Sequence, residues 1–187
     1  MATALWLLGI QGVIGAFDTL YYHEWRARLP TGVPQTAPEL KLHAARDFLY
    51  AVLFGSLPWL AWQGLWGILL AFVLLAEIAF TMADFVVEIS VRKPLGDVYA
   101  GERVTHALMG IVYGAMIAHL LAPLRHWWLL PTALVAAPAD VPRALRWTLS
   151  MMAAGVLVSG ARDLYSALRL PHGGWPWRVP AAPKTVA

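Results

Sequence analysis

The chain has 187 residues, of which 59% are hydrophobic and only 13% are charged, and its mean hydropathy is +0.60. A soluble domain of ordinary composition is about 45–50% apolar, so this composition excludes a typical soluble globular protein. The sequence contains no cysteine, which excludes disulfides, thiolate metal sites and iron–sulfur clusters.

Five transmembrane helices are predicted from apolar stretches that, with their flanks, reach the roughly 20 residues needed to cross a bilayer. The run over 49–76 is too long for one span, and Pro58, Gly64 and Gly67 divide it at a predicted tight turn. No small-residue cleavage site follows the N-terminal run, so we expect a retained span there rather than a secretory signal. The predicted helices cover residues 3–28, 39–62, 64–92, 101–122 and 145–169.

These spans predict an all-α integral membrane protein whose first four helices, within residues 1–122, form a four-helix bundle. Residues 123–144 are apolar but broken by proline, and we expect them to lie at the outer membrane surface. The fifth transmembrane helix falls within 145–170. The proline-rich residues 171–187 are expected to form a cytoplasmic tail.

The distribution of Lys and Arg predicts the orientation of the chain. If the N-terminus is outside, every Lys and Arg except Arg125, Arg143 and Arg146 falls on the inner side. The positive-inside rule therefore predicts an outer N-terminus and a cytoplasmic C-terminus, as in a bacterial inner membrane. Basic inner loops next to anionic lipid also account for the pI near 9.4, so no nucleic-acid partner is expected.

Two segments of the chain resemble each other. Residues 17–30 match 83–94 at an offset of 64, and the segments that follow match at an offset of 63. The matched pairs are Glu24 with Glu88, Arg28 with Arg92, Pro30 with Pro94, Glu39 with Glu102, His43 with His106, and Tyr50 with Tyr113. We therefore predict two repeated helical hairpins, about 1–62 and 64–122, related by a pseudo-two-fold axis.

The repeat brings acidic residues and histidines to one depth, roughly 24–35 Å from the outer helix ends at 1.5 Å per residue. This depth is near the cytoplasmic face. Spacing of four residues places each Glu/His pair on one helix face. Carboxylates can bridge and neutralise divalent metal ions, and imidazoles add nitrogen ligands. The predicted metal ligands are Glu24, Glu39, His43, Glu88, Glu102 and His106.

One Glu from each of two helices, with a Glu/His pair from each of two others, resembles the ligand set of the ferritin-like di-iron or di-manganese carboxylate proteins. The resemblance covers roughly residues 18–110, and here the Glu and His lie four rather than three residues apart. A site near the membrane surface is also similar to that of the membrane-associated alternative oxidases, which reduce O2 with quinol. The resemblance implies two divalent metal ions, iron first among them. It also implies an O2-dependent oxidoreductase acting on a lipid, a quinone or another membrane-soluble substrate.

Other polar residues lie at the same level. Asp18, Asp47 and Asp84 are expected either to replace one of the ligands or to accept a hydrogen bond from a ligating imidazole. Tyr50 and Tyr113 are the candidate catalytic residues, as donors of hydrogen bonds or electrons.

Simpler interpretations exist for several of these acids. Thr36 and Glu39 fit a capping box, and Glu102 opens its helix, where the helix dipole favours an acid. Glu24 and Glu88 fit interfacial ion pairs. Glu77 lies deep in the hydrocarbon, so we expect it to be protonated or paired, through a hydrogen bond to a neighbouring helix or as part of a proton or substrate path.

Three other functions remain open at this point. In a haem-b electron carrier, His43 and His106 would be the axial ligands. A metal-ion transporter would use the same ligands and Glu77, although few polar residues lie farther outward. The third is a non-catalytic subunit or assembly factor, with a membrane-protein partner or a homo-oligomer.

Overall fold

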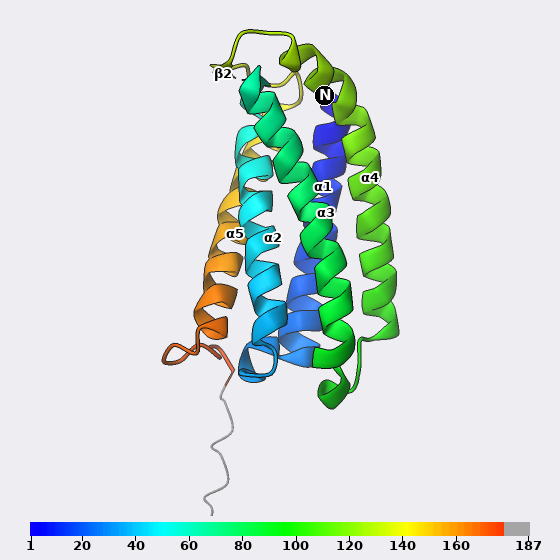
Figure 1. The fold of residues 1–187 in the computed structure, drawn as a ribbon, viewed down its shortest axis with the longest axis vertical. Helices are drawn as coiled ribbons and strands as arrows, with labels where there is room; N and C mark the ends of the chain where they lie inside the picture. Colours follow the sequence, from blue (N-terminus) through cyan, green and yellow to red (C-terminus); the bar gives the residue numbers. More distant parts are fainter. Residues whose placement is uncertain (178–187) are drawn as a thin grey trace, which may run out of the picture.

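The computed structural model describes residues 1–177 and contains five long helices (Figure 1). The first continues without a break into a stretch of wider π-helix. Two short 3-10 turns, η2 (Leu29–Thr31) and η3 (Lys93–Leu95), connect helices at one end of the bundle. The long elements are α1 (Ala2–Phe17) with its π-helical continuation η1 (Asp18–Ala27), α2 (Ala37–Ser56), α3 (Leu65–Val91), α4 (Ala100–Trp128) and α5 (Arg143–Ala167).

Four of these helices are long and apolar enough to cross a membrane, namely Ala2–Ala27, α3, α4 and α5. Their outward side chains are those expected to face lipid; for example, Phe72 and Ile111 are 70% and 69% exposed. Four long apolar helices indicate a membrane protein. The remaining helix, α2, contains Glu39, Lys41, Arg46 and Asp47 in addition to apolar residues, and its place as a fifth span remains a prediction.

The helices pair in a definite pattern. α2 packs along α5 and also against α3, while α1 packs along α4. The close pairs α1/α4 and α2/α3 each join one helix from residues 1–62 to one from 64–122. The arrangement of the bundle as two repeated hairpins remains a prediction. Buried apolar side chains such as Leu8, Phe54, Leu70 and Met116 form the main core.

A small antiparallel sheet lies at the end of the bundle near the N-terminus, which we call the strand end (Figure 1). The predicted helix over 39–62 stops at Ser56, two residues before Pro58, which has no backbone N–H to continue the helical hydrogen bonds. β1 (Leu60–Gln63) then pairs with β2 (Ala133–Ala136). α4 extends past its predicted end at residue 122 to Trp128, with Pro123 inside it. The segment predicted to lie at the outer surface is thus a helix end, a strand and a short loop.

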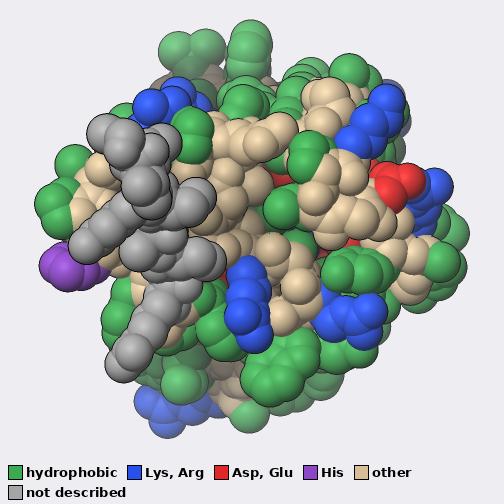
Figure 2. Space-filling model, turned by 90° about the horizontal axis from the view of Figure 1, so that it is seen from below, with side chains coloured by type: hydrophobic (Ala, Val, Ile, Leu, Met, Phe, Trp, Pro, Cys, Tyr) green, Lys and Arg blue, Asp and Glu red, His purple; other side chains and the backbone are tan. Residues whose placement is uncertain are grey.

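The opposite end contains the 3-10 turns and the start of the C-terminal segment. Lys and Arg side chains surround this end, and few acidic side chains are visible on it (Figure 2). Residues 171–177 form turns beside η1 and α5, where the indole N–H of Trp177 donates a hydrogen bond to Glu24 over 3.2 Å. The rest of the predicted tail lies outside the described residues.

Candidate metal centre

Buried polar side chains gather in the half of the bundle remote from the strands, where four elements meet. Each of the eight is 8% exposed or less. Burial of so many ionisable groups is costly unless they are paired or bind a cation, and in a membrane segment such groups mark a functional site. They are Asp18 and His23 from η1, Glu39 and His43 from α2, Asp84 and Glu88 from α3, and Glu102 and His106 from α4.

Asp18, His23 and His106 form a first group, which we call the Asp18 group. The Nε2 atom of His106 is hydrogen-bonded to Asp18 Oδ2 over 3.2 Å, and His23 Nε2 lies 3.3 Å from the same oxygen. One ligand atom from each residue lies within 4.8 Å of the other two. This group can hold a metal ion. Glu102 Oε1, 3.2 Å from His23 Nε2, and Glu88 Oε2, 3.9 Å from His106 Nδ1, border it.

The π-helical form of η1 explains how Asp18 and His23 come to one side. In an α-helix, residues five positions apart point in different directions, whereas residues three or four apart share a face. In a π-helix the backbone hydrogen bonds run from residue i to i+5 and each turn is wider, so residues five apart lie closer to one side than they do in an α-helix. π-Helical turns are rare and often occur at functional sites.

Glu39, His43 and Asp84 form a second group, the Glu39 group, whose ligand atoms also lie within 4.8 Å of one another. His43 Nε2 is 3.2 Å from Asp84 Oδ2 and 3.8 Å from Glu39 Oε1. Glu39 and His43 share a face of α2 because they are four residues apart. This group, too, can hold a metal ion.

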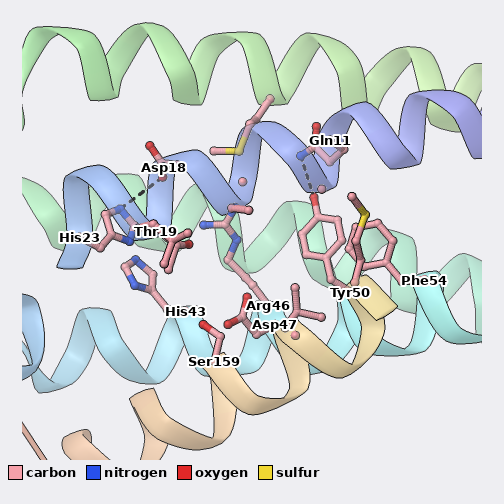
Figure 3. A pocket seen from close by; sticks show the side chains of 18 of the residues that line it. Gln11, Asp18, Thr19, His23, His43, Arg46, Asp47, Tyr50, Phe54 and Ser159 are labelled. Atoms are coloured by element: carbon pink, nitrogen blue, oxygen red, sulfur yellow. Dashed lines mark hydrogen bonds and ion pairs between the residues drawn. The ribbon is translucent and has the colours of Figure 1, made fainter. Parts of the chain in front are cut away.

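The two groups are adjacent. The rings of His23 and His43 stack with centroids 4.5 Å apart and planes inclined by 9° (the two residues are labelled in Figure 3). The buried guanidinium of Arg92 joins them on another side, since its Nε donates to Glu39 over 2.7 Å and its NH2 group donates to Glu102 over 2.9 Å. Together the groups form one polar centre.

The acids of this centre outnumber its fixed cations. Asp18, Glu39, Asp84 and Glu102 are 3% exposed or less, and the described guanidinium groups that contact them belong to Arg92 and Arg46. Arg46 donates to Asp84 over 3.0 Å. A buried carboxylate without a counter-charge is unfavourable, so additional positive charge, from protonated imidazoles or bound metal ions, would balance the centre.

Several ligand atoms also lack a hydrogen-bond partner. Asp18 Oδ1, Glu39 Oε2 and Asp84 Oδ1 are buried without a hydrogen bond, and His23 Nε2 makes none in spite of its short distances to Asp18 and Glu102. Buried polar atoms are nearly always satisfied, so an unpaired group requires an explanation, and an unplaced ion is one of those explanations. Oxygen and imidazole nitrogen are the donors that divalent iron, manganese and zinc accept. The residues present therefore fit a metal ion in each group.

The structure brings together five of the six predicted ligands: Glu39, His43, Glu88, Glu102 and His106. Glu24 lies apart from them and faces α5. There it pairs with Arg162 through both carboxylate oxygens and accepts the indole hydrogen bond of Trp177. Its neighbour His23 points to the centre instead.

Of the three acids predicted as substitute ligands or as partners of the imidazoles, two lie in the centre and one does not. Asp18 and Asp84 each belong to one of the two groups, whereas Asp47 lies against α5 near Gly160. The capping-box interpretation of Glu39 does not describe the structure, because the Thr36 hydroxyl donates to the carbonyl of Leu29 and caps no helical N–H. Glu39 pairs with Arg92 instead.

Two residues of the centre were not expected from the sequence. The signal of His23 is its position five residues after Asp18, which has meaning only if the helix is π-helical there. Asp163 of α5 lies 3.9 Å from His43 Nδ1 and can orient that imidazole from behind. It lies outside the repeated segments, so the repeat gave no indication of it.

Tyr50 and Tyr113 lie one layer deeper, toward the strand end. Their ring centroids are 6.0 Å apart. The Tyr50 hydroxyl accepts a hydrogen bond from Gln11 Nε2 over 2.9 Å, and the Tyr113 hydroxyl donates to the carbonyl of Leu74 over 3.2 Å. Neither hydroxyl contacts the Asp18 group or the Glu39 group in a described hydrogen bond.

A cavity of about 330 Å³ adjoins the centre and is lined by α1, η1, α2 and α5, with Met109 of α4 (Figure 3). Asp18, His23 and His43 form part of its wall, so both groups border it. Most of the remaining wall is apolar. The centre therefore opens to a space that can hold a small apolar molecule.

Comparison with known proteins identifies no relative: no protein-family model, no curated protein and no solved structure matches the chain significantly.

Proposed function

We propose that this protein is a membrane-integral oxidoreductase with two metal ions, iron first among the candidates, that uses O2 to oxidise a lipid, quinone or other membrane-soluble substrate. The observation that carries the proposal is the adjacency of two buried groups of carboxylate and imidazole ligands, joined by the stack of His23 on His43. Two ions at adjacent positions suit chemistry on a small molecule that contacts both.

In this proposal, Asp18, His23 and His106 hold one ion, and Glu39, His43 and Asp84 hold the other. Bound iron would supply the electron transfer to O2, which is reduced to water with the electrons and protons that the substrate loses. The protein's own residues position these ligands. Asp163 orients His43, while Arg92 holds Glu39 and Glu102 in place through its two ion pairs. Glu88 and Glu102 are additional ligands or orient the imidazoles that they contact.

Tyr50 and Tyr113 are proposed to act in the transfer of hydrogen or electrons between the cavity and the centre. Tyr50 lines the cavity, and its neighbour on α2, Arg46, reaches the Glu39 group through Asp84. Arg46 Nε also lies 3.6 Å from Glu77, whose carboxylate accepts a hydrogen bond from Thr81. The paired state expected for Glu77 accounts for its burial.

The proposed orientation places the N-terminus outside and the metal centre near the cytoplasmic face of a bacterial inner membrane. The basic residues around the end of the bundle opposite the strands support this orientation (Figure 2). α2 would then be a fifth span that packs against α5 and α3, with Glu39 and Arg46 turned toward the centre.

The other candidate functions have less support. A haem between His43 and His106 would compete for space with His23, whose ring lies 4.5 Å and 6.3 Å from theirs. A transporter needs a polar path toward the strand end, where the described core is made of residues such as Leu74, Met116 and Leu120. A non-catalytic subunit or assembly factor would not require the two ligand groups. A membrane-protein partner or a second copy is compatible with each of these functions.

Elemental analysis combined with an absorption spectrum of the purified protein tests the proposal. We expect about two metal ions per chain and no haem Soret band. Iron-loaded protein should also consume O2 when supplied with a quinol. Fewer than about one ion per chain after reconstitution with iron, manganese or zinc would contradict the proposal, and a Soret band would favour the haem carrier.

A further inference from the structure

The cavity beside the metal centre lies between two helices that share few contacts, the first helix (Ala2–Ala27) and α5. Near the strand end they approach closely, since a Cβ atom at Gly9 would lie 3.5 Å from the Leu145 side chain. At the opposite end, Glu24 of η1 pairs with Arg162 of α5. The two helices contribute residues from 11–23 and 152–163 to the cavity wall, so the cavity occupies the interval between these contacts.

The cavity has an opening on the outer side of this interval. Ala16, Leu20 and Gly155 line the cavity and are nevertheless exposed, Leu20 to 67%. Gly155 is the middle residue of α5. It therefore lies about 18 Å from either end of that helix at 1.5 Å per residue. The hydrocarbon core of a bilayer is about 30 Å thick, so a spanning α5 places this opening within the hydrocarbon.

The same cavity reaches the metal centre. Asp18, His23 and His43 belong to its wall, together with apolar residues such as Leu20 and Val156. A molecule inside the cavity can therefore contact both ligand groups while the opening joins it to the lipid. Burial of apolar surface in such a space favours an apolar molecule.

Residues 171–177, which we call the C-terminal turns, lie against the Glu24–Arg162 pair. The indole N–H of Trp177 donates to Glu24 over 3.2 Å, and Arg162 donates to the carbonyl of Trp175 over 2.8 Å. The guanidinium of Arg28 lies 4.6 Å from the centroid of the Trp177 ring. These contacts join η1 to α5 at the end of the bundle remote from the strands.

This cluster lies at the limit of the cavity. His23 and Asp163 line the cavity, and their neighbours in sequence, Glu24 and Arg162, form the pair that carries the C-terminal turns. The side chains of that pair are only 18% and 24% exposed. The contacts of the C-terminal turns therefore stand between the cavity and the water at this end of the protein.

We propose that an apolar molecule dissolved in the bilayer enters the cavity sideways, between the first helix and α5, and that the C-terminal turns close the cavity to water. The inference rests on the proposed function only where it identifies this molecule as the substrate. Exclusion of water would also strengthen the electrostatic interactions at the centre.

A single thiol in the cavity wall tests the inference, because the sequence contains no cysteine. Ser159→Cys places the thiol in the wall, where Figure 3 shows Ser159 beside Asp47. The full-length variant in lipid nanodiscs is treated either with N-cyclohexylmaleimide, which dissolves in the bilayer, or with a sulfonated maleimide, which stays in water. Mass spectrometry measures each rate relative to that of Lys93→Cys, an exposed position in η3.

We expect N-cyclohexylmaleimide to modify Ser159→Cys. The relative rate of the sulfonated reagent should be at least about tenfold lower, because a charged group is costly to move into hydrocarbon. Equal relative rates for the two reagents would show that the cavity is open to water and would overturn the inference. The absence of any reaction with N-cyclohexylmaleimide would also overturn it.

Two tryptophans give a matched pair of variants in the Ser159→Cys background. Trp177→Ala removes an indole that holds the C-terminal turns, whereas Trp6→Ala removes a 51% exposed indole near the strand end. The first should raise the rate of the sulfonated reagent about tenfold, because water then reaches the thiol, and the second should not change it. Gly173→Leu should act like Trp177→Ala, since a Cβ atom there would lie 3.0 Å from Ser166 Cα.

An unchanged rate in both Trp177→Ala and Gly173→Leu would show that the C-terminal turns do not close the cavity, against the inference. Metal content measured on the same samples separates the two proposals. Selective reaction with the lipid-soluble reagent in a protein that binds no metal would support the sideways entrance and overturn the metal centre. Two bound metal ions with equal relative rates would overturn the entrance alone.

Discussion

The imidazole ring of His23 stacks on that of His43, with ring centroids 4.5 Å apart and planes inclined by 9°. The two histidines belong to different ligand groups, one built on η1 and α4 and the other on α2 and α3. This contact makes two separate clusters into one centre. Loss of either ring should therefore affect metal binding more than loss of any surface histidine.

Replacement of His23 tests the group that the sequence did not predict. His23→Ala removes one of three ligands from the Asp18 group and leaves the Glu39 group complete, so we expect the metal content to fall from about two ions per chain to about one. His126→Ala, an exposed position near the end of α4, is the control. Unchanged metal content in His23→Ala, measured by elemental analysis, would show that His23 is not a ligand.

Glu24 and Glu102 were predicted to play equivalent roles, but the structure gives them different partners. Glu24 pairs with Arg162, whereas Glu102 contacts His23 and Arg92 inside the centre. We expect Glu102→Gln to weaken metal binding by roughly 10- to 100-fold and Glu24→Gln to leave it unchanged. A metal titration followed by absorbance measures both. A larger effect of Glu24→Gln would return Glu24 to the ligand set.

Arg92 is the largest fully buried side chain among residues 1–177, and it pairs with two carboxylates. Arg92→Met leaves Glu39 and Glu102 without this counter-charge, so the free energy of unfolding of the metal-free protein should fall by about 3–5 kcal/mol. Added divalent metal should restore part of the loss, because it supplies positive charge at the same place. Chemical unfolding in detergent, with and without metal, measures the difference.

Arg103 provides the matched control for that experiment. It pairs with Asp97 on the surface, where the two side chains are 61% and 58% exposed. The backbone N–H of Val98 is the main cause of the lowered pKa of Asp97, so this carboxylate stays charged without Arg103. Arg103→Met should change the stability little. If both variants lost the same free energy of unfolding, Arg92 would contribute only through the net charge of the protein and not through its ion pairs with Glu39 and Glu102.

The packing of α2 on α5 supports both the centre and the cavity. A Cβ atom at Gly160 would lie 2.8 Å from Asp47 Cβ and 3.2 Å from the backbone oxygen of Ala44. Gly160→Ala should therefore lower the free energy of unfolding by about 1–3 kcal/mol. Gly114→Ala on α4 meets no atom within 4 Å and should be neutral or stabilising. Thermal unfolding of both variants would contradict this if Gly160→Ala were the more stable.

The sequence predicted the helices well, since long apolar stretches have few alternatives in a membrane protein. It also indicated that acids and histidines of several helices lie at one depth, because the positions of Glu39, His43, Glu102 and His106 follow from an ordinary helical rise. The strands were not predicted, since four residues such as Leu60–Gln63 carry too short a pattern to be told from a turn.

The sequence also could not show which of two neighbouring residues faces the centre. Glu24 and His23 differ by one position, and only the π-helical geometry of η1 turns His23 toward the centre and Glu24 toward Arg162. A periodicity of 3.6 residues cannot indicate this. The position of Asp163 beside His43 results from the packing of α5 against α2. This contact joins segments distant in sequence, so no local pattern shows it.

The most direct test of two adjacent metal ions is anomalous diffraction from crystals of the iron-loaded protein, recorded on both sides of the iron absorption edge. We expect two anomalous peaks in each chain, one among Asp18, His23 and His106 and the other among Glu39, His43 and Asp84. A well-ordered centre without a peak, in which only Arg92, Arg46 and the imidazoles balance the acids, would contradict the presence of two metal ions.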